Sequence, residues 1–133
     1  MIILPQTTIA AAVTAQLSGV QYFLQVPNSI LTLQAAFNYG AGGTNVKAWV
    51  QTTFDGGASW ADIASFVFTT TAGRRLFNLG RAVAITTQAT PTDGTLADNT
   101  AINGLIGPVL RVKYTTTGTY TGATNLTIAA ISG

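Results

Sequence analysis

Apolar and polar residues alternate along several short stretches of this sequence. The alternation is regular in 46–54, where Val46, Ala48 and Val50 share one side of an extended chain. A period of two places successive side chains on opposite faces of a β-strand, so the pattern is typical of strands with one buried face. The sequence predicts eight or nine strands, within about 7–15, 20–26, 30–37, 46–54, 60–69, 74–79, 81–89, 109–115 and 124–131.

Residue types and turn signals favour the same architecture. The chain has 23 threonines among many other β-branched and aromatic residues, which suit a pleated sheet. Glycine, asparagine, aspartate and proline divide it at intervals of about ten residues, a spacing typical of sandwiches and barrels. We expect an all-β, single-domain antiparallel β-sandwich, jelly-roll-like or Ig-like, with little or no helix. The Ala-rich segment Ile9–Leu17 also has helical propensity, but its flanking threonines favour a strand.

The predicted domain has one terminal extension and two notable loops. A chain of 133 residues suits a single core, and we assign 7–133 to the sandwich and 1–6 to an N-terminal arm that could add a strand to a neighbouring subunit. Residues 39–44 form a glycine-rich, flexible loop. Residues 90–108 contain four turn signals, and a loop of this length is usually functional or ordered by a partner.

Charged residues are scarce. Only 8% of the residues are charged, against roughly a quarter in an average soluble domain. The first charged side chain is Lys47 and the last is Lys113. We therefore expect much of the surface to be covered by copies of the chain, with a trimer favoured, or by a larger assembly. The candidate interface residues are Ile2, Ile3, Leu4 and Pro5 of the arm, together with Arg74, Arg75 and Arg81.

The composition also removes most catalytic and metal chemistry. The chain lacks cysteine, histidine and glutamate, so disulfides, thiolate or imidazole metal sites and Ser-His triads are excluded. Asp93 and Asp98 share the long loop and could bind calcium or act as an acid–base pair, but we expect instead a turn at Asp93-Gly94 and a cap at Asp98. We expect no enzyme activity, no cofactor, no specific nucleic-acid binding and, since no apolar run approaches about 20 residues, no membrane span.

One local motif is specific. A [Ser/Thr]-x-Asp-x-Gly-x-[Ser/Thr]-Trp pattern predicts a hairpin in which Asp bonds turn amides, glycines take positive φ and Trp packs against the turn. The hairpin residues are Thr53, Asp55, Gly56, Gly57, Ser59 and Trp60. The motif resembles the Asp-box of sialidases and several other β proteins, where it is structural. The sialidase arginine triad and Tyr/Glu pair cannot be placed on a chain without glutamate.

Aromatic residues suggest an alternative function. On a β-sandwich, exposed rings on one face can form a sugar-stacking platform, whereas buried rings belong to the core. The candidates are Trp49, Trp60, Tyr39, Tyr114 and Tyr120. A glycan-binding module would show two or more such rings on one exposed face.

Three segments resemble small virion proteins of tailed bacteriophages and prophages. They are VKAWVQTTFDGGASWADIASFVF, TPTDGTLADNTAINGLIGP and the closing LRVKYTTTGTYTGATNLTIAAISG. The resemblance implies a non-enzymatic structural virion protein, a capsid decoration or minor capsid protein that binds the major capsid protein and stabilises the head. It also implies synthesis in the bacterial host cytoplasm and a place on the capsid surface rather than the tail. The alternative is a receptor- or glycan-binding module of a tail fibre or head spike.

Overall fold

The computed structural model describes residues 1–19, 21–24, 30–81 and 83–132. Within these ranges there is no helix, and therefore none that could cross a membrane. The described strands are β1 (Ile2–Thr8), β2 (Val13–Leu17), β3 (Tyr22–Phe23), β4 (Ile30–Asn38), β5 (Ala41–Gly42), β6 (Asn45–Thr53), β7 (Ala61–Phe68), β8 (Gly73–Gly80), β9 (Val109–Thr117), β10 (Tyr120–Thr121) and β11 (Asn125–Ser132).

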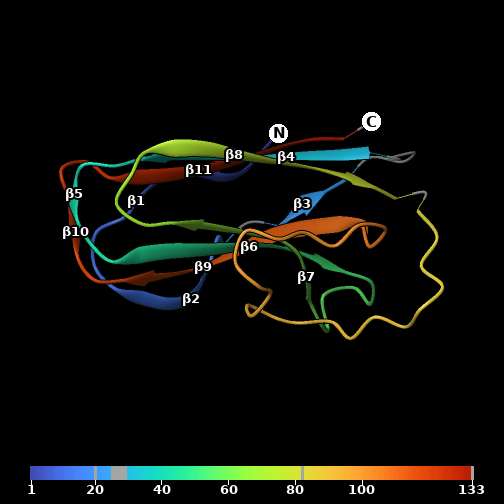
Figure 1. The fold of residues 1–133 in the computed structure, drawn as a ribbon. Coiled ribbons are helices and arrows are strands. Elements are labelled where there is room, and N and C mark those ends of the chain that lie inside the picture. Colours follow the sequence, from blue (N-terminus) through green and yellow to red (C-terminus); the bar gives the residue numbers. More distant parts are fainter. Residues whose placement is uncertain (20, 25–29, 82, 133) are drawn as a thin grey trace.

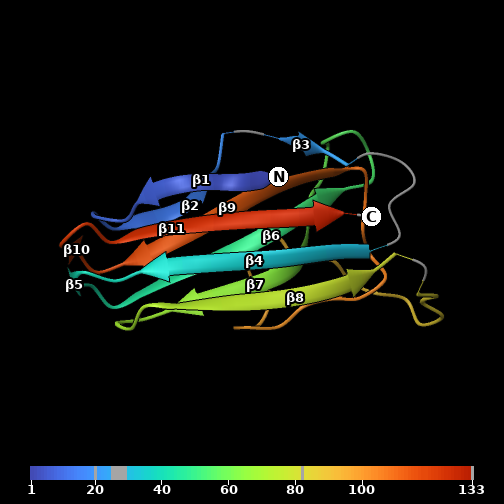
Figure 2. The ribbon, with the colours of Figure 1, turned by 90° about the horizontal axis from the view of Figure 1, so that it is seen from above.

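The strands form two antiparallel sheets in two layers (Figure 1). The four-stranded sheet has the order β1-β11-β4-β8, which is visible from above (Figure 2). The five-stranded sheet has the order β2-β9-β6-β7, with β3 also paired to β9. The short pair β10-β5 lies at one end. The prediction of an all-β, antiparallel, single-domain fold is confirmed, and the strand order, which the sequence left open, is now defined.

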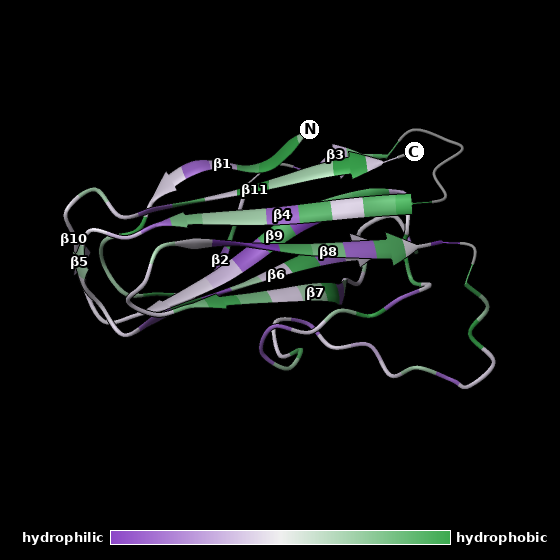
Figure 3. Cartoon of the chain, turned by 45° about the horizontal axis from the view of Figure 1, so that its top comes forward, coloured by the Kyte–Doolittle hydropathy of each residue, from purple (hydrophilic) through white to green (hydrophobic). Residues whose placement is uncertain are grey.

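The core lies between the two sheets. Alternate residues of β4, from Leu31 to Phe37, are at most 1% exposed, and β6 and β11 follow the same alternation at Val46 and Leu126. Because every second residue points inward, hydrophobic and polar positions alternate along these strands (Figure 3). Rings close one end of the core, where Phe37 stacks on Phe68 with centroids 5.0 Å apart.

The predicted N-terminal arm is instead the first strand of the four-stranded sheet. β1 pairs with β11, and Ile3 and Leu4 are 0% and 2% exposed. Register shifts on both sides of Leu4 explain how two consecutive side chains reach the core. Pro5 is compatible with this position because β1 is an edge strand. The expectation that residues 1–6 extend to a neighbour is therefore wrong, and Ile3 and Leu4 are core residues rather than interface residues.

Three strand predictions also need correction. The segment 7–15 is not one strand, because β1 ends at Thr8 and the chain crosses to the other sheet before β2 begins at Val13. No strand occurs among the described residues of 81–89, which belong to a long connection from β8 to β9. Of the predicted strand 20–26, Val20, Gln25 and Val26 lie outside the described residues and only Tyr22–Phe23 is a strand. The glycine-rich loop 39–44 contains β5.

Candidate functional site

The β6–β7 hairpin is organised by the carboxylate of Asp55. Oδ1 accepts hydrogen bonds from the Thr53 hydroxyl (2.9 Å) and the Ser59 backbone N–H (2.8 Å), and Oδ2 accepts one from the Ser59 hydroxyl (2.5 Å). Thr53 Oγ1 also accepts the Gly57 N–H at 2.9 Å. Gly56 and Gly57 have φ values of 72° and 96°, which glycine adopts without strain. The hydrogen bonds from Ser59, and then that from Thr53, hold the pKa of Asp55 below its ordinary value of 3.8.

Trp60 is half-buried and stands beside a cation. The guanidinium carbon of Arg111 lies 4.1 Å from its ring centroid. Trp60 therefore supplies less buried area than the motif suggested. Trp49 is the core tryptophan, 6% exposed, with its Nε1–H donating to the Leu96 carbonyl at 3.2 Å.

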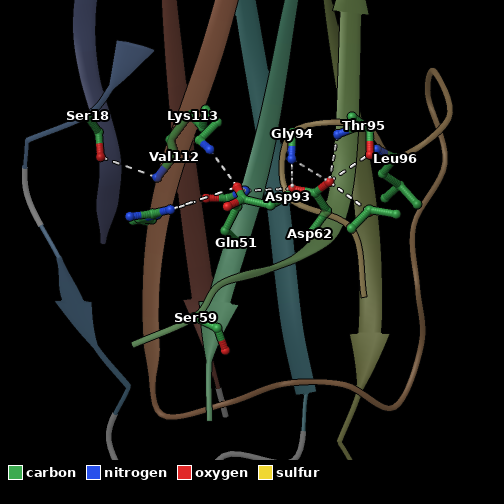
Figure 4. Close-up of polar contacts among 12 residues, drawn as sticks. Ser18, Gln51, Ser59, Asp62, Asp93, Gly94, Thr95, Leu96, Val112 and Lys113 are labelled. Atoms are coloured by element: carbon green, nitrogen blue, oxygen red, sulfur yellow. Dashed lines mark hydrogen bonds and ion pairs between the residues drawn. The ribbon is translucent and has the colours of Figure 1, made fainter. Parts of the chain in front are cut away.

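The long loop is attached to the five-stranded sheet through Asp62. This carboxylate is 1% exposed and receives donors from β6 and from consecutive loop residues (Figure 4). Its donors are Gln51 Nε2 (2.8 Å), Thr92 Oγ1 (2.8 Å) and the backbone N–H groups of Gly94 (2.9 Å), Thr95 (3.0 Å) and Leu96 (3.1 Å). Successive N–H groups that converge on one anion form a nest, and here the anion is the chain's own side chain.

The same loop covers the free edge of β7. Its carbonyls at Thr92 and Thr100 accept the N–H groups of Asp62 and Ser65, both at 2.8 Å, and Ile102 N–H donates to the Ile63 carbonyl at 2.8 Å. From its length, this loop was expected to be functional or to be ordered by a partner. The structure shows that the chain's own β7 orders residues 92–102. The signal for this role is the single aspartate in the mainly apolar strand ADIASFVF, which the sequence analysis did not select.

Asp93 lies beside the Asp62 anchor but faces two cations. Its Oδ1 accepts hydrogen bonds from Lys113 Nζ (2.5 Å) and Gln51 Nε2 (2.6 Å), and Arg111 Nη2 lies 3.9 Å away. Burial raises the pKa of Asp93, but the hydrogen bonds and charges of these neighbours outweigh it and lower the pKa below 3.8. Gln51 links the two carboxylates and also accepts Arg111 Nε–H at 2.8 Å.

Asp98 does not join Asp93. It forms an exposed ion pair with Lys47 at 3.3 Å. Among the described residues, no three Asp, Glu, His or Cys side chains gather in a group that could hold a metal ion. Each loop aspartate is thus accounted for by a lysine of the five-stranded sheet.

A groove lies between the hairpin and the beginning of the long loop. It has a volume of about 420 Å³. One wall is the hairpin, with Phe54, which is 60% exposed, and Trp60; the other is loop 85–93 with Asp93. The full lining is Thr52, Phe54, Ser59, Trp60, Ala61, Ile85, Thr86, Thr87, Gln88, Ala89, Pro91, Thr92, Asp93 and Leu105.

The predicted aromatic platform is mostly core. Tyr120 is 1% exposed and donates its hydroxyl to the Thr69 carbonyl at 2.7 Å, and its ring meets Tyr39 edge-on at 6.1 Å. Tyr114 is partly buried against the core. Of the five predicted rings, only Trp60 lines the groove, and its companion there is Phe54, which the sequence analysis did not select.

The three predicted interface arginines lie on or directly after β8. Arg74 and Arg75 are exposed, and Arg75 bends across the edge so that its guanidinium carbon lies 5.1 Å from the Phe68 ring centroid. Arg81 is exposed immediately after the strand. Ile2 (47% exposed) and Pro5 are the exposed members of the predicted N-terminal set.

The site was also compared with known proteins. No protein-family model, curated protein or solved structure matches this chain. Its function is therefore argued from its own residues.

Proposed function

We propose that this chain is a non-enzymatic structural virion protein, of the capsid decoration or minor capsid type, that associates with copies of itself. The observation that carries the proposal is the uneven distribution of charge between the two sheets. The sequence resemblance to small phage virion proteins supports the virion setting, and the proposed partner beyond the chain itself is the major capsid protein.

Most charged side chains belong to the five-stranded sheet and the loops on it. These are Lys47, Asp55, Asp62, Asp93, Asp98, Arg111 and Lys113. The outward positions of the four-stranded sheet are different: rows such as Ile131–Thr32–Asn78 and Ala129–Gln34–Leu76 cross it without a charge. Arg74, opposite Ala36, is the one charged residue at these outward positions within the described strands.

This outer face also exposes large apolar side chains. Ile131 is 73% exposed, Leu76 58%, Ile30 49% and Ile2 47%. Single exposed apolar residues are ordinary, but several on one uncharged face are typical of a protein–protein contact. In Figure 3 this face is in view, and purple segments are short on β4 and β11.

A second copy of the chain fits this face best. A face with almost no charge can be desolvated against a neighbouring copy without leaving its own unpaired ions in the contact, which would cost several kcal/mol each. Homo-oligomer contacts are correspondingly more apolar than ordinary surface. A charged partner would instead leave its own ions unmatched there.

The features of the sheet edges also favour a contact through the four-stranded sheet. β1 carries Pro5 and register shifts, β2 has a register shift and Ala15 at φ 49°, and β7 is covered by the long loop. Such features prevent edge-to-edge pairing. β8 pairs with β4 from Gly73 to Gly80 without a register shift. Among the described residues, the long loop is hydrogen-bonded to β8 only where Gly80 N–H donates to Asn103 Oδ1 at 2.6 Å. β8 is therefore the edge least covered by the rest of the chain, and Arg74 and Arg75 would lie in or beside a contact formed there.

The test is the mass of the protein in solution, measured by light scattering at low micromolar concentration. We expect about 41 kDa, three times the 13.7 kDa of one chain. Ile131→Asp should reduce the mass to that of one chain. Phe23→Asp is the matched control, because Phe23 is 72% exposed but lies on β3 of the other sheet. A monomeric wild type, or an Ile131→Asp variant of unchanged mass, contradicts assembly through this face.

The virion setting has a separate test. Particles purified from a culture of the source phage should contain this chain at a fixed ratio to the major capsid protein. Empty heads lacking the chain should bind it, and should then withstand heating better. If it is absent from purified particles, the virion proposal fails even where self-association is observed.

A receptor- or glycan-binding module is the second candidate function. The specific observation that favours it is the groove with two accessible rings, Phe54 and Trp60, on one side of the molecule.

A further inference from the structure

We infer that the groove between the β6–β7 hairpin and loop 85–93 binds a neutral saccharide. The inference rests on the second candidate function and names its site and ligand class. It does not depend on assembly through the four-stranded sheet, because the groove is formed by the hairpin of the other sheet and the loop lying on it.

The hairpin wall of the groove and one end of its loop wall are held in place without a ligand. The hairpin wall is fixed by the hydrogen bonds of Asp55 to Thr53 and Ser59. The far end of the loop wall is fixed where Thr92 and Gly94 donate to Asp62. A preformed site loses little conformational entropy when it binds, which favours weakly interacting ligands such as sugars.

The aromatic residues provide an apolar surface of suitable form. Arg111 lies over the Trp60 ring at 4.1 Å and so fixes its orientation, while the ring also contributes to the groove lining. Phe54 is 60% exposed although it is a large apolar side chain. The C–H face of a pyranose ring is apolar and can pack on such rings, which would remove Phe54 and Trp60 from water.

The polar lining complements sugar hydroxyls. Thr86, Thr87 and Gln88 supply donors and acceptors along the loop wall. Among the described residues, hydrogen bonds reach Asp93 only at Oδ1, so Oδ2 can accept from a hydroxyl group. A mainly apolar pocket with a few placed polar groups is the usual form of a small-molecule site, and about 420 Å³ lies within the usual range of about 300–1,000 Å³.

Local charge favours a neutral ligand. Asp93 is the one charged residue in the groove lining, and Lys113 and Arg111 stand directly behind it. These cations are already engaged with Asp93, so an anionic sugar would meet the exposed carboxylate without a free cation. An uncharged hexose or N-acetylhexosamine meets no such repulsion.

The experiment is a titration of ¹⁵N-labelled protein, followed by NMR, with glucose, galactose, mannose, N-acetylglucosamine and their neutral disaccharides. We expect at least one sugar to shift the Trp60 indole N–H signal in a saturable way at millimolar concentration. Trp49 is an internal control, because its buried indole N–H is bonded to Leu96. The same sugar should leave the Trp49 signal unchanged.

Two variants test the assignment. Phe54→Ala should weaken binding about tenfold, the change that follows from losing one well-packed contact. Phe23→Ala removes a ring of similar exposure on β3 and should bind like wild type. The inference is overturned if no sugar shifts the Trp60 indole N–H signal, or if Phe54→Ala and wild type bind with equal affinity. It is also overturned if peptides shift this signal and sugars do not. Light scattering of the same samples separates this result from assembly, because Phe54→Ala should keep the wild-type mass.

Discussion

The backbone N–H of Gly94 donates to both carboxylate oxygens of Asp62, at 2.9 Å each. The two residues belong to different parts of the fold: Asp62 is in β7, and Gly94 is in the loop that crosses the outside of the five-stranded sheet. The Asp–Gly pair at 93–94 was expected to be a simple turn. Gly94, at φ 81°, instead presents its amide to a buried anion.

Replacing Asp62 should destabilise the protein more than replacing any other aspartate. Asp62→Ala removes the acceptor of five donors, of which only Gln51 Nε2 keeps another, Asp93 Oδ1. A buried unsatisfied group costs about 1–3 kcal/mol. We expect the free energy of unfolding in urea to fall by about 3 kcal/mol or more.

Asp98→Ala is the matched control for this change. It removes an exposed carboxylate with one ion pair, to Lys47, and should cost less than about 1 kcal/mol. Hydrogen exchange provides a second measurement, because the amides of Thr95 and Leu96 should lose protection in Asp62→Ala alone. Equal destabilisation by the two variants would show that the loop is held by other contacts.

Acidification should weaken the hairpin through Asp55. Its pKa is lower in the folded chain than the ordinary 3.8, so its contribution to stability is complete above about pH 3.8 and is lost as the pH falls through the lower, folded value. Ser59→Ala removes the largest cause of the shift and should move the pKa of Asp55 upward, toward 3.8. Carboxyl ¹³C NMR titration measures this directly.

The neighbouring aspartate shows whether the change is local. Asp93 owes its lowered pKa to Lys113, Gln51 and Arg111, so Ser59→Ala should leave that pKa unchanged. Thr53→Val should raise the pKa of Asp55 less than Ser59→Ala does, since the Thr53 hydrogen bond is a smaller cause. An Asp55 pKa that does not respond to Ser59→Ala would mean that the hydroxyl does not bond the carboxylate in solution.

The sequence was sufficient for elements whose own residues determine them. The period of two in 46–54 identified β6, and the Asp-Gly-Gly turn identified the hairpin that follows, because both signals act between near neighbours. The same reasoning gave the wrong prediction for residues 1–6, which were expected to form an arm. Burial of both Ile3 and Leu4 requires a register shift against β11, and β11 lies more than a hundred residues away in the chain.

Glycine at position 43 should be required for packing as well as for backbone conformation. Gly19 and Gly43 have nearly equal φ values, 76° and 73°, so alanine strains the backbone similarly at both, by about 1–2 kcal/mol. A Cβ at Gly19 meets no atom within 4 Å, whereas a Cβ at Gly43 would overlap the ring of buried Tyr120. We therefore expect Gly43→Ala to cost about 1–3 kcal/mol more than Gly19→Ala in urea unfolding. Equal costs would mean that Tyr120 moves aside freely.

The candidate site was less predictable than the fold because it combines distant segments. The hairpin at 53–60 and loop 85–93 line one groove although they are distant in sequence, and the Asp62 side chain is one of the contacts that hold the loop against the sheet. Phe54 had no distinguishing pattern in the sequence, since its exposure depends on that arrangement. The scarcity of charged residues, in contrast, was visible from the composition. That most of them lie on the five-stranded sheet could be recognised only once the strand order was known.

A charge placed at Leu76 should test the face and the edge of the four-stranded sheet together. Leu76 is 58% exposed, stands opposite Gln34 on β4 and belongs to the open edge strand β8. Leu76→Lys adds an ammonium group that would have to be desolvated in a contact between copies, so the dissociation constant of the oligomer should rise about tenfold or more. Leu17→Lys is the control, because Leu17 is 42% exposed on β2 of the other sheet. Sedimentation equilibrium measures both.

Each substituted side chain is exposed, so the two variants should unfold at similar urea concentrations. A difference in mass between them then reports the location of the contact rather than a loss of fold. If Leu17→Lys dissociates the oligomer and Leu76→Lys does not, copies meet through the five-stranded sheet, and the uncharged face must be assigned to another protein of the assembly.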